Sequence, residues 1–170
     1  AGVRAFAVAC LAEGIALRKA GIRGTILILG YTSPEEAPLL TRWHLTQTVA
    51  DIDHGRALAA RGRRVHVHLA LDTGMHRLGI LAENRKEILE AFRLPNLGVD
   101  GVFSHLYVSD SLEAEDVAYT QEQLTLFYDT VAWLRTAGYD PGKVHIQSSY
   151  GLWNLPAQPC DYVRAGIALY

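Results

Sequence analysis

The sequence predicts an α/β fold, an incomplete (β/α)8 barrel, and two observations carry that prediction. Short apolar segments that favour strands alternate with longer, more polar segments that favour helices, which is typical of βα units around a parallel sheet. The chain offers seven strand candidates in 170 residues, whereas a closed barrel of this class needs eight strands in roughly 250 residues. We therefore expect one partial barrel domain over residues 1–170, with strands 2 to 8 of the barrel present and the first strand absent.

The strand candidates share short runs of apolar, often branched residues, which suit a buried parallel sheet. In chain order they cover residues 4–9, 25–31, 45–50, 65–72, 101–108, 144–149 and 161–167. The helix candidates lie between them and cover residues 10–20, 34–42, 52–61, 82–93 and 112–137. Turn residues mark several helix ends, since Gly21 and Gly62 follow two helices and Ser33-Pro34 opens a third.

The last helix candidate has the clearest periodicity. Apolar residues recur in it at steps of three, four and seven residues, which places them on one face of a helix. These residues are Val117, Leu124, Phe127, Val131 and Leu134. Gly138 follows at the position of a C-cap, so the helix is expected to end there.

Composition narrows the classes of partner and compartment. With 49% hydrophobic and 20% charged residues the chain suits a globular domain with a real core, and its formal net charge of -2 argues against nucleic acid or an anionic membrane as partner. Cys10 and Cys160 form no disulfide or metal motif, so we expect buried thiols in a reducing compartment. No apolar run approaches the roughly 18 residues of a membrane span, and the first residues lack a signal-peptide pattern. We expect a cytoplasmic segment, which could belong to a larger protein.

The strand at 65–72 indicates which residues face the barrel interior. Its odd positions are all branched aliphatics, which suit a covering layer of helices, whereas its even positions are His66, His68, Ala70 and Asp72. The same alternation groups further polar residues on two other strands. One group is His145, Gln147 and Ser149, and the other is Phe103, His105 and Tyr107. Several strands thus direct polar side chains toward one interior, at or near the strand ends where βα barrels build active sites.

One chemistry for such an interior is a metal site. His66 and His68 would supply two imidazoles from one strand face, and His105, His145 or Asp72 could complete the ligand set. Acidic ligands are sparse and no HExxH-type spacing is present, which counts against a metal. The alternative is that His66 and His68 lie near the start of the strand and are satisfied by hydrogen bonds in the bottom of the barrel.

The other chemistry is a cofactor anchored by its phosphate. Barrels of this class often bind phosphate with the loops after their last two strands, and Ser149 and the segment Arg-Ala-Gly-Ile at 164–167 lie at those positions. Gly166 would let backbone N–H groups approach an anion closely, and the Ser149 hydroxyl can donate to it. The alternative is a glycine bend in a buried strand beside a structural arginine, Arg164.

Six segments, taken in order, resemble the barrel domain of alanine racemases. They are FAVACLAEGIALRKAGI, ILILGY, LALDTGMHRLGI, GVFSHLYVSD, HIQSSYGLWNLP and DYVRAGIALY. The resemblance extends over essentially the whole chain, and LDTGMHRLGI and DYVRAGIALY are its most specific parts. HIQSSYG and TGMHRLG are more similar to the serine/alanine racemase domains linked to vancomycin resistance than to housekeeping alanine racemases.

The resemblance implies pyridoxal 5'-phosphate (PLP) as the cofactor and assigns roles to particular residues. Arg164 corresponds to the arginine that faces the pyridine nitrogen; because arginine does not give up its proton, that nitrogen stays unprotonated and PLP becomes a weaker electron sink, which favours racemisation. His145 would support Arg164, and His105 would pack beside the cofactor ring. Arg77 would reach the cofactor phenolic oxygen and the substrate carboxylate, although by itself it would be taken for an exposed loop arginine.

The phosphate of PLP is also assigned by the resemblance. It would be held by the Ser149 hydroxyl together with the backbone N–H groups of Gly166 and Ile167. The complete set of residues implied for catalysis or cofactor binding is Arg77, His105, His145, Ser149, Arg164, Gly166 and Ile167.

Three groups that the family uses are missing from this sequence. Lys19, Lys86 and Lys143 are its only lysines, and none lies at the C-terminal end of a predicted strand, so the Schiff-base lysine is expected on a first strand that would precede Ala1. The tyrosine base would come from a β-rich C-terminal domain and act across a homodimer interface. Ala70 stands where many relatives have a carbamylated lysine that orients the arginine represented by Arg77, so chloride, water or another residue takes over that task or Arg77 is less firmly held.

The resemblance implies a PLP-dependent racemase of alanine or serine that works by two-base proton transfer and supplies D-amino acids for peptidoglycan. The 170-residue segment alone is expected to be inactive, because the lysine and the tyrosine are outside it. Two other interpretations remain open. One is a PLP-binding barrel without racemase activity, and the other is a metal-dependent barrel fragment, for example a hydrolase.

Overall fold

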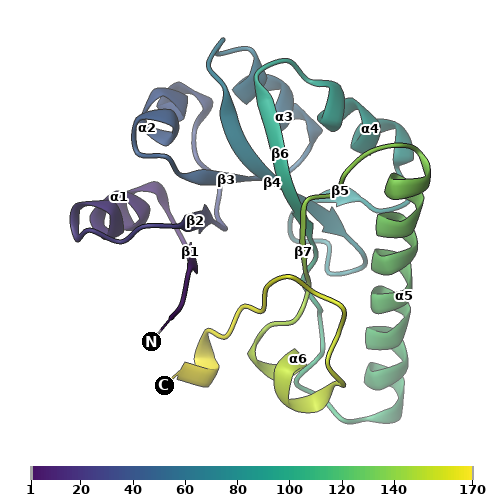
Figure 1. Cartoon of the computed structure of the whole chain (residues 1–170). Helices are drawn as coiled ribbons and strands as arrows, with labels where there is room; N and C mark the ends of the chain where they lie inside the picture. The colour runs from purple at the N-terminus through teal and green to yellow at the C-terminus, as the bar shows by residue number, and fades with distance from the viewer. Residues whose placement is uncertain (1, 170) are drawn as a thin grey trace.

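A computed structural model describes residues 2–169 and shows an open, entirely parallel sheet curved into part of a barrel (Figure 1). The strands are β1 (Ala5–Val8), β2 (Thr25–Ile28), β3 (Thr46–Val49), β4 (Val65–Asp72), β5 (Ile80–Leu81), β6 (Leu97–Phe103) and β7 (Lys143–His145). Their order is β1-β2-β3-β4-β6-β7, with the two-residue β5 paired to the end of β4. The prediction of an incomplete (β/α) barrel is confirmed.

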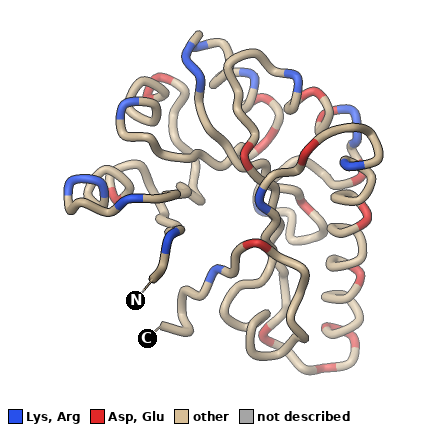
Figure 2. The backbone as a smooth tube through the Cα atoms, viewed as in Figure 1, with Lys and Arg blue, Asp and Glu red and all other residues tan. Residues whose placement is uncertain are grey.

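Helices follow the strands, and all but the last of them cover the convex side of the sheet, while the concave side faces the two chain ends (Figure 1). They are α1 (Leu11–Lys19), α2 (Ala37–Arg42), α3 (Ile52–Ala59), α4 (Arg85–Arg93), α5 (Ala114–Thr136) and α6 (Ser149–Asn154), with 3-10 turns at Pro34–Glu36 and Ile167–Leu169. Within residues 2–169 no helix is both long and apolar enough to cross a membrane. Basic and acidic residues are scattered over the outer elements, and α5 carries mainly acidic ones (Figure 2).

Strand β4 confirms the predicted alternation. Val65, Val67, Leu69 and Leu71 are at most 1% exposed and belong to the hydrophobic core between the sheet and the helices. On the other face of the strand, His66 is exposed, but His68, Ala70 and Asp72 lie along the concave side. Because the pairing residues of parallel neighbours point the same way, Phe103 of β6 and His145 of β7 lie on this concave side as well.

The predicted strand at 161–167 is wrong. Only an isolated bridge joins Ser148 to Arg164, and the segment is otherwise irregular. Two backbone bonds join the segments, from the Asp161 N–H to the Val144 carbonyl at 2.8 Å and from the Arg164 N–H to the Gln147 carbonyl at 2.9 Å. The ladder is incomplete because the Val144 N–H donates to the Asp161 carboxylate at 2.9 Å, where a strand would offer a carbonyl. The Gly166 N–H then turns back onto the Arg164 carbonyl at 3.0 Å and ends the extended run.

Other boundaries also differ from the predictions. The strands predicted at 101–108 and 144–149 end at Phe103 and His145, and residues 149–154 form helix α6 instead. The buried face of α5 includes Leu124, Phe127, Val131 and Leu134 as predicted, but Val117, in the first turn of the helix, is 43% exposed. The prediction of two buried thiols is wrong for Cys10, which is exposed at the start of α1, and Cys160 is half-buried.

Gly101 creates the space in which His68 lies. A Cβ at this position would come within 2.6 Å of the Lys143 carbonyl oxygen and 2.7 Å of the His68 imidazole. The pairing of β4 with β6 shifts its register at the same level, between Val67 and His68. A bare backbone at Gly101 therefore lets a buried imidazole pack directly on the neighbouring strand.

We predict that Gly101→Ala destabilises the protein by about 1–3 kcal/mol, because the new methyl group collides with backbone and ring atoms in a closely packed interior. The control is Gly151→Ala in α6, where a Cβ would make ordinary contacts of 3.5–3.6 Å and alanine favours the helix. Urea unfolding of both variants checks this. A Gly101→Ala variant as stable as Gly151→Ala would contradict the described packing.

Candidate active site

A cavity of about 890 Å³ opens on the concave side of the sheet. The ends of β4, β6 and β7 form one wall, and the irregular segment from Tyr162 to Leu169 forms another. Strand β1, at the open edge of the sheet, contributes Ala5 and Ala7. The cavity thus lies at the strand ends where the sequence predicted a site. It also lies between the two edges of the open barrel, β1 on one side and β7 with residues 162–169 on the other.

Arg164 is the most firmly held side chain of this cavity. Its Nη2 donates to the Ser104 carbonyl at 2.7 Å and to the Ile146 carbonyl at 3.1 Å, and it lies 3.2 Å from His105 Nδ1. Its Nη1 lies 2.7 Å from His145 Nδ1. The guanidinium also lies over the Phe103 ring, with Cζ 5.1 Å from the ring centroid. Contacts from β6, β7 and the loops after them therefore fix its orientation.

The arginine determines the hydrogen positions of a chain of buried imidazoles. A guanidinium only donates hydrogen bonds, so His145 Nδ1 must accept and its Nε2 must carry the proton. His145 Nε2 lies 2.9 Å from His68 Nδ1, which therefore accepts, and the His68 proton is on Nε2 as well. Phe103 stacks on His145 with 4.8 Å between ring centroids and 5° between ring planes, which holds the central ring in this orientation.

Burial and the arginine charge keep these histidines neutral. Removal from water lowers the pKa of His145 to about 2, helped by the Arg164 charge and by His68. Burial is also the main reason that the pKa of His68 falls to about 4. The pKa of His105 falls to about 4 through burial and the charges of Arg164 and Arg77. Burial lowers the pKa of Arg164 to about 10, which leaves it charged at neutral pH.

Ser149, Gly166 and Ile167 lie together on one side of the cavity. The Ser149 hydroxyl oxygen accepts from the Ala168 N–H at 3.1 Å, so its own proton is available to an anion. The Gly166 N–H donates to the Arg164 carbonyl instead. A Cβ at Gly166 would meet no atom within 4 Å, so the space beside this backbone is open. Two backbone N–H groups are expected to donate to a phosphate. In the structure the Ile167 N–H makes no hydrogen bond to residues 2–169 and can do so, whereas the Gly166 N–H is already bonded to the Arg164 carbonyl.

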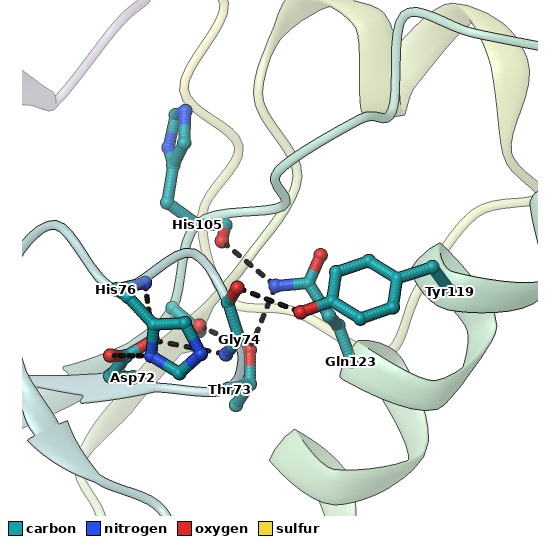
Figure 3. Close-up of polar contacts among 8 residues, drawn as sticks. Asp72, Thr73, Gly74, His76, His105, Tyr119 and Gln123 are labelled. Atoms are coloured by element: carbon teal, nitrogen blue, oxygen red, sulfur yellow. Dashed lines mark hydrogen bonds and ion pairs between the residues drawn. The ribbon is translucent and has the colours of Figure 1, made fainter. Parts of the chain in front are cut away.

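Arg77 is carried by the loop of residues 73–79 between β4 and β5, called here the Arg77 loop. Asp72 organises its start, since Oδ1 accepts from the backbone N–H groups of Gly74 and His76 at 3.0 Å each and Oδ2 lies 2.9 Å from His76 Nδ1 (Figure 3). Burial alone would raise the pKa of Asp72, but these hydrogen bonds outweigh it and lower the pKa. Gly74 has a φ of 133°, and a Cβ there would collide with the Tyr119 hydroxyl.

The guanidinium of Arg77 lines the cavity mouth and is exposed, with no hydrogen-bond partner among the described residues. Ala70, two residues before the end of β4, lines the cavity with a methyl group only. Arg77 is therefore placed by its loop, and not by a side chain at position 70. No lysine lines the cavity within residues 2–169: Lys19 lies on α1, Lys86 on α4, and Lys143 pairs with Asp161 at 2.9 Å.

The imidazoles do not gather around one point as metal ligands would. His66 is exposed and its Nδ1 lies 2.7 Å from the Asp100 carboxylate, at the bottom of the barrel as the hydrogen-bonded interpretation expected. His68 is part of the cavity wall instead. Over residues 2–169, no three His, Cys, Asp or Glu side chains are close enough to one another to hold a metal ion. The metal-site interpretation thus finds no ligand set in the described part of the chain.

Comparison with known proteins gives the family. The sequence model of "Alanine racemase, N-terminal domain" matches residues 1–170. The chain belongs to this family. An alanine racemase from Clostridium difficile 630, solved in complex with cycloserine, superposes with a TM-score of 0.87 at 31% identity over 97% of this chain and 46% of that one. The predicted resemblance is confirmed.

Curated relatives support the predicted subgroup. An amino-acid racemase of Enterococcus faecalis is 46% identical to this chain over 99% of its length. A serine/alanine racemase of Enterococcus gallinarum is 44% identical, also over 99% of this chain. An alanine racemase of Geobacter sulfurreducens is 38% identical over 99% of the chain. The chain spans about a quarter (24%) of each Enterococcus protein and 46% of the Geobacter protein.

Sequence reasoning missed three residues of the site and its surroundings. The strand pattern predicts that Phe103 faces inward but indicates no role for it, and in the structure its ring stacks on His145. His68 was assigned to a metal site or the barrel bottom, whereas it ends the Arg164–His145 chain. Gln123 was not singled out, although a polar residue beside Leu124 on the buried face of α5 was a signal that it binds something.

The neutral histidines predict an acid-sensitive fold. Their folded pKa values lie below the unfolded value of about 6.5, so the unfolded state binds more protons and stability is lost as pH falls below about 6.5. Each fully buried histidine contributes up to about 1.4 kcal/mol per pH unit in that window. We expect His68→Gln to reduce the slope of unfolding free energy against pH between about 6.5 and 5, as measured by urea unfolding.

The control for this prediction is His66→Gln, which removes an exposed histidine from the same strand. It is expected not to reduce the slope. If His68→Gln retains the full slope, the buried chain of neutral imidazoles is not what makes the protein acid-sensitive.

Proposed function

We propose that the protein containing this chain is a PLP-dependent racemase of a small amino acid, alanine or serine. The observation that carries the proposal is Arg164, which lines the cavity and is fixed by contacts with Ser104, Ile146, His105 and His145. The racemase relatives and the family membership support it. PLP, when bound, supplies an electron sink that makes the α-proton of an amino acid removable.

The donor set of the cavity fits PLP. Ser149 and the Ile167 N–H offer donors suited to a phosphate, and Gly166 leaves open space beside them. Arg164 has N–H groups left over after its contacts with described residues, and these suit an acceptor such as the ring nitrogen. The residue that would bind the cofactor covalently is not among residues 2–169, and we propose that it is a lysine elsewhere in the protein, as in the family.

Arg164 would hold the ring nitrogen without giving it a proton. Its pKa, about 10, keeps the guanidinium charged near neutral pH, and His145 cannot take a proton from it because burial holds the pKa of that imidazole at about 2. Arg164 would therefore donate a hydrogen bond to that nitrogen and leave it unprotonated. The weaker electron sink that results favours return of the proton to the α-carbon, which is the outcome that racemisation needs.

Arg77 would bind the substrate carboxylate at the mouth of the cavity. It is an unpaired cation among the described residues, and a guanidinium matches a carboxylate in a two-pronged geometry. His105, neutral and beside Arg164, would lie against the cofactor ring. The apolar part of the wall, with Leu27, Leu29 and Phe103, would exclude water from the reacting centre.

The remaining parts of the proposal concern the whole protein. The second acid/base group would be a tyrosine from a C-terminal domain, acting across a homodimer, and the product would be D-alanine or D-serine for peptidoglycan. We propose the cytoplasm as its location, in keeping with the two free cysteines among the described residues.

Replacing Arg164 tests the proposal directly. In the full-length protein we expect Arg164→Ala to lower racemisation by about 100-fold or more, because a preorganised charged donor is lost, and to change the visible absorbance of bound PLP. Arg135→Ala, on the exposed end of α5, is the control. Racemisation and absorbance that both match the unaltered protein would sink the assignment of Arg164.

Replacing Arg77 tests substrate binding. We expect Arg77→Gln to raise the KM for the amino acid by about tenfold or more through loss of a charge-assisted contact, while PLP stays bound. Steady-state kinetics with L-alanine and L-serine measure this, and the two substrates also decide the preference. An unchanged KM for both would show that the carboxylate is bound elsewhere.

A further inference from the structure

Gln123 joins the two loops that carry Arg77 and His105. It lies on α5 with 1% of its surface exposed, and its amide makes three contacts, of which Figure 3 shows the two made by the nitrogen. Its Oε1 accepts from the Tyr107 N–H at 2.9 Å, and its Nε2 donates to the His105 carbonyl and to Thr73 Oγ1 at 3.4 Å each. One side chain outside the sheet therefore touches the Arg77 loop and residues 104–107, called here the His105 loop.

The orientation of this amide follows from its partners. The Tyr107 N–H can only donate and the His105 carbonyl can only accept, so the oxygen and the nitrogen of the amide cannot be exchanged. A second contact between the loops runs beneath it, since Thr73 Oγ1 lies 2.8 Å from Ser104 Oγ. The carbonyl of Ser104 is in turn the 2.7 Å partner of Arg164. A chain of hydrogen bonds thus connects Gln123 to Arg164 through Thr73 and Ser104.

Tyr119, one turn earlier on α5, hydrogen-bonds to only one of the two loops, although its ring also lies edge-on to the Tyr107 ring, with 6.3 Å between ring centroids, a contact that phenylalanine would keep. Its hydroxyl donates to the Gly74 carbonyl at 2.8 Å. Residues 119 and 123 lie on the same face of the helix, four positions apart. Both side chains hydrogen-bond to the Arg77 loop, whereas only Gln123 hydrogen-bonds to the His105 loop. This difference separates the effects of the two side chains.

We propose that Gln123 is a positioning residue that makes the Arg77 and His105 loops one rigid unit, and that it does so in place of a side chain at Ala70. Arg77 has no hydrogen-bond partner of its own among residues 2–169, so the distance from its charge to His105 and Arg164 depends on how the loop is fastened. An error of about 1 Å in such a placement can cost about 100-fold in rate. The catalytic consequence rests on the proposed racemase function; the mechanical coupling does not.

The test is hydrogen exchange, followed by mass spectrometry, of the full-length protein. We expect Gln123→Leu, which keeps the volume but loses all three contacts, to speed up exchange in residues 73–79 and 104–107 together, by about tenfold or more. Tyr119→Phe should speed up exchange in residues 73–79 only. Gln121→Ala, an exposed glutamine on the same helix, is the matched control and should change neither.

Kinetics complete the test. Gln123→Leu should lower kcat/KM by about 10- to 100-fold while PLP stays bound, because Ser149 and Ile167 are untouched. Unchanged exchange in either loop, or acceleration spread evenly over the whole chain, would overturn the proposal. If the unaltered protein does not racemise alanine or serine, the proposed function fails while the exchange pattern still decides whether Gln123 couples the loops.

Discussion

The guanidinium of Arg164 can donate hydrogen bonds but never accept one, and the polar interior of this fold is ordered around that fact. The guanidinium donates hydrogen bonds to the Ser104 and Ile146 carbonyls, which lie just after the ends of β6 and β7. His145 and His105 must turn acceptor nitrogens toward it, and His68 must follow His145. This half-buried positive charge has no carboxylate partner among residues 2–169, which leaves it available to a ligand that brings an acceptor.

The sheet places these groups, and the helices keep them still. Parallel strands end at one edge, so side chains far apart in sequence meet there, and Gly101 gives up its side chain so that His68 can lie between strands. Helix α5 contributes little to the cavity wall, but Gln123 and Tyr119 fasten the loops that do. Arg77, exposed and carried by such a loop, is the part of the site that depends most on this outer support.

Much of this arrangement could be predicted from the sequence. The βα alternation predicted the partial barrel, and the alternation of residues 65–72 predicted which side chains face inward. The family resemblance predicted one site for Arg164, His145, His105 and Ser149, and all four line the cavity. The strand at 161–167 could not be excluded from its pattern, because the Asp161 side chain replaces the ladder and apolar periodicity does not report such a contact. The roles of Gln123 and Phe103 could not be predicted for a similar reason. Their partners are distant in the sequence and are known only once the folded positions of the loops and strands are known.

Arg164 fixes the protonation of the imidazoles around it, and 15N NMR of histidine-labelled protein near neutral pH tests this. We expect His145, His68 and His105 all to be neutral and to carry their proton on Nε2, since Nδ1 of His145 and of His68 accepts a hydrogen bond and Nδ1 of His105 faces the N–H groups of Arg164 at 3.2 Å. Shifts of an imidazolium, or of an Nδ1–H tautomer at His145, would contradict it, because the arginine could then not be the donor around which the interior is built.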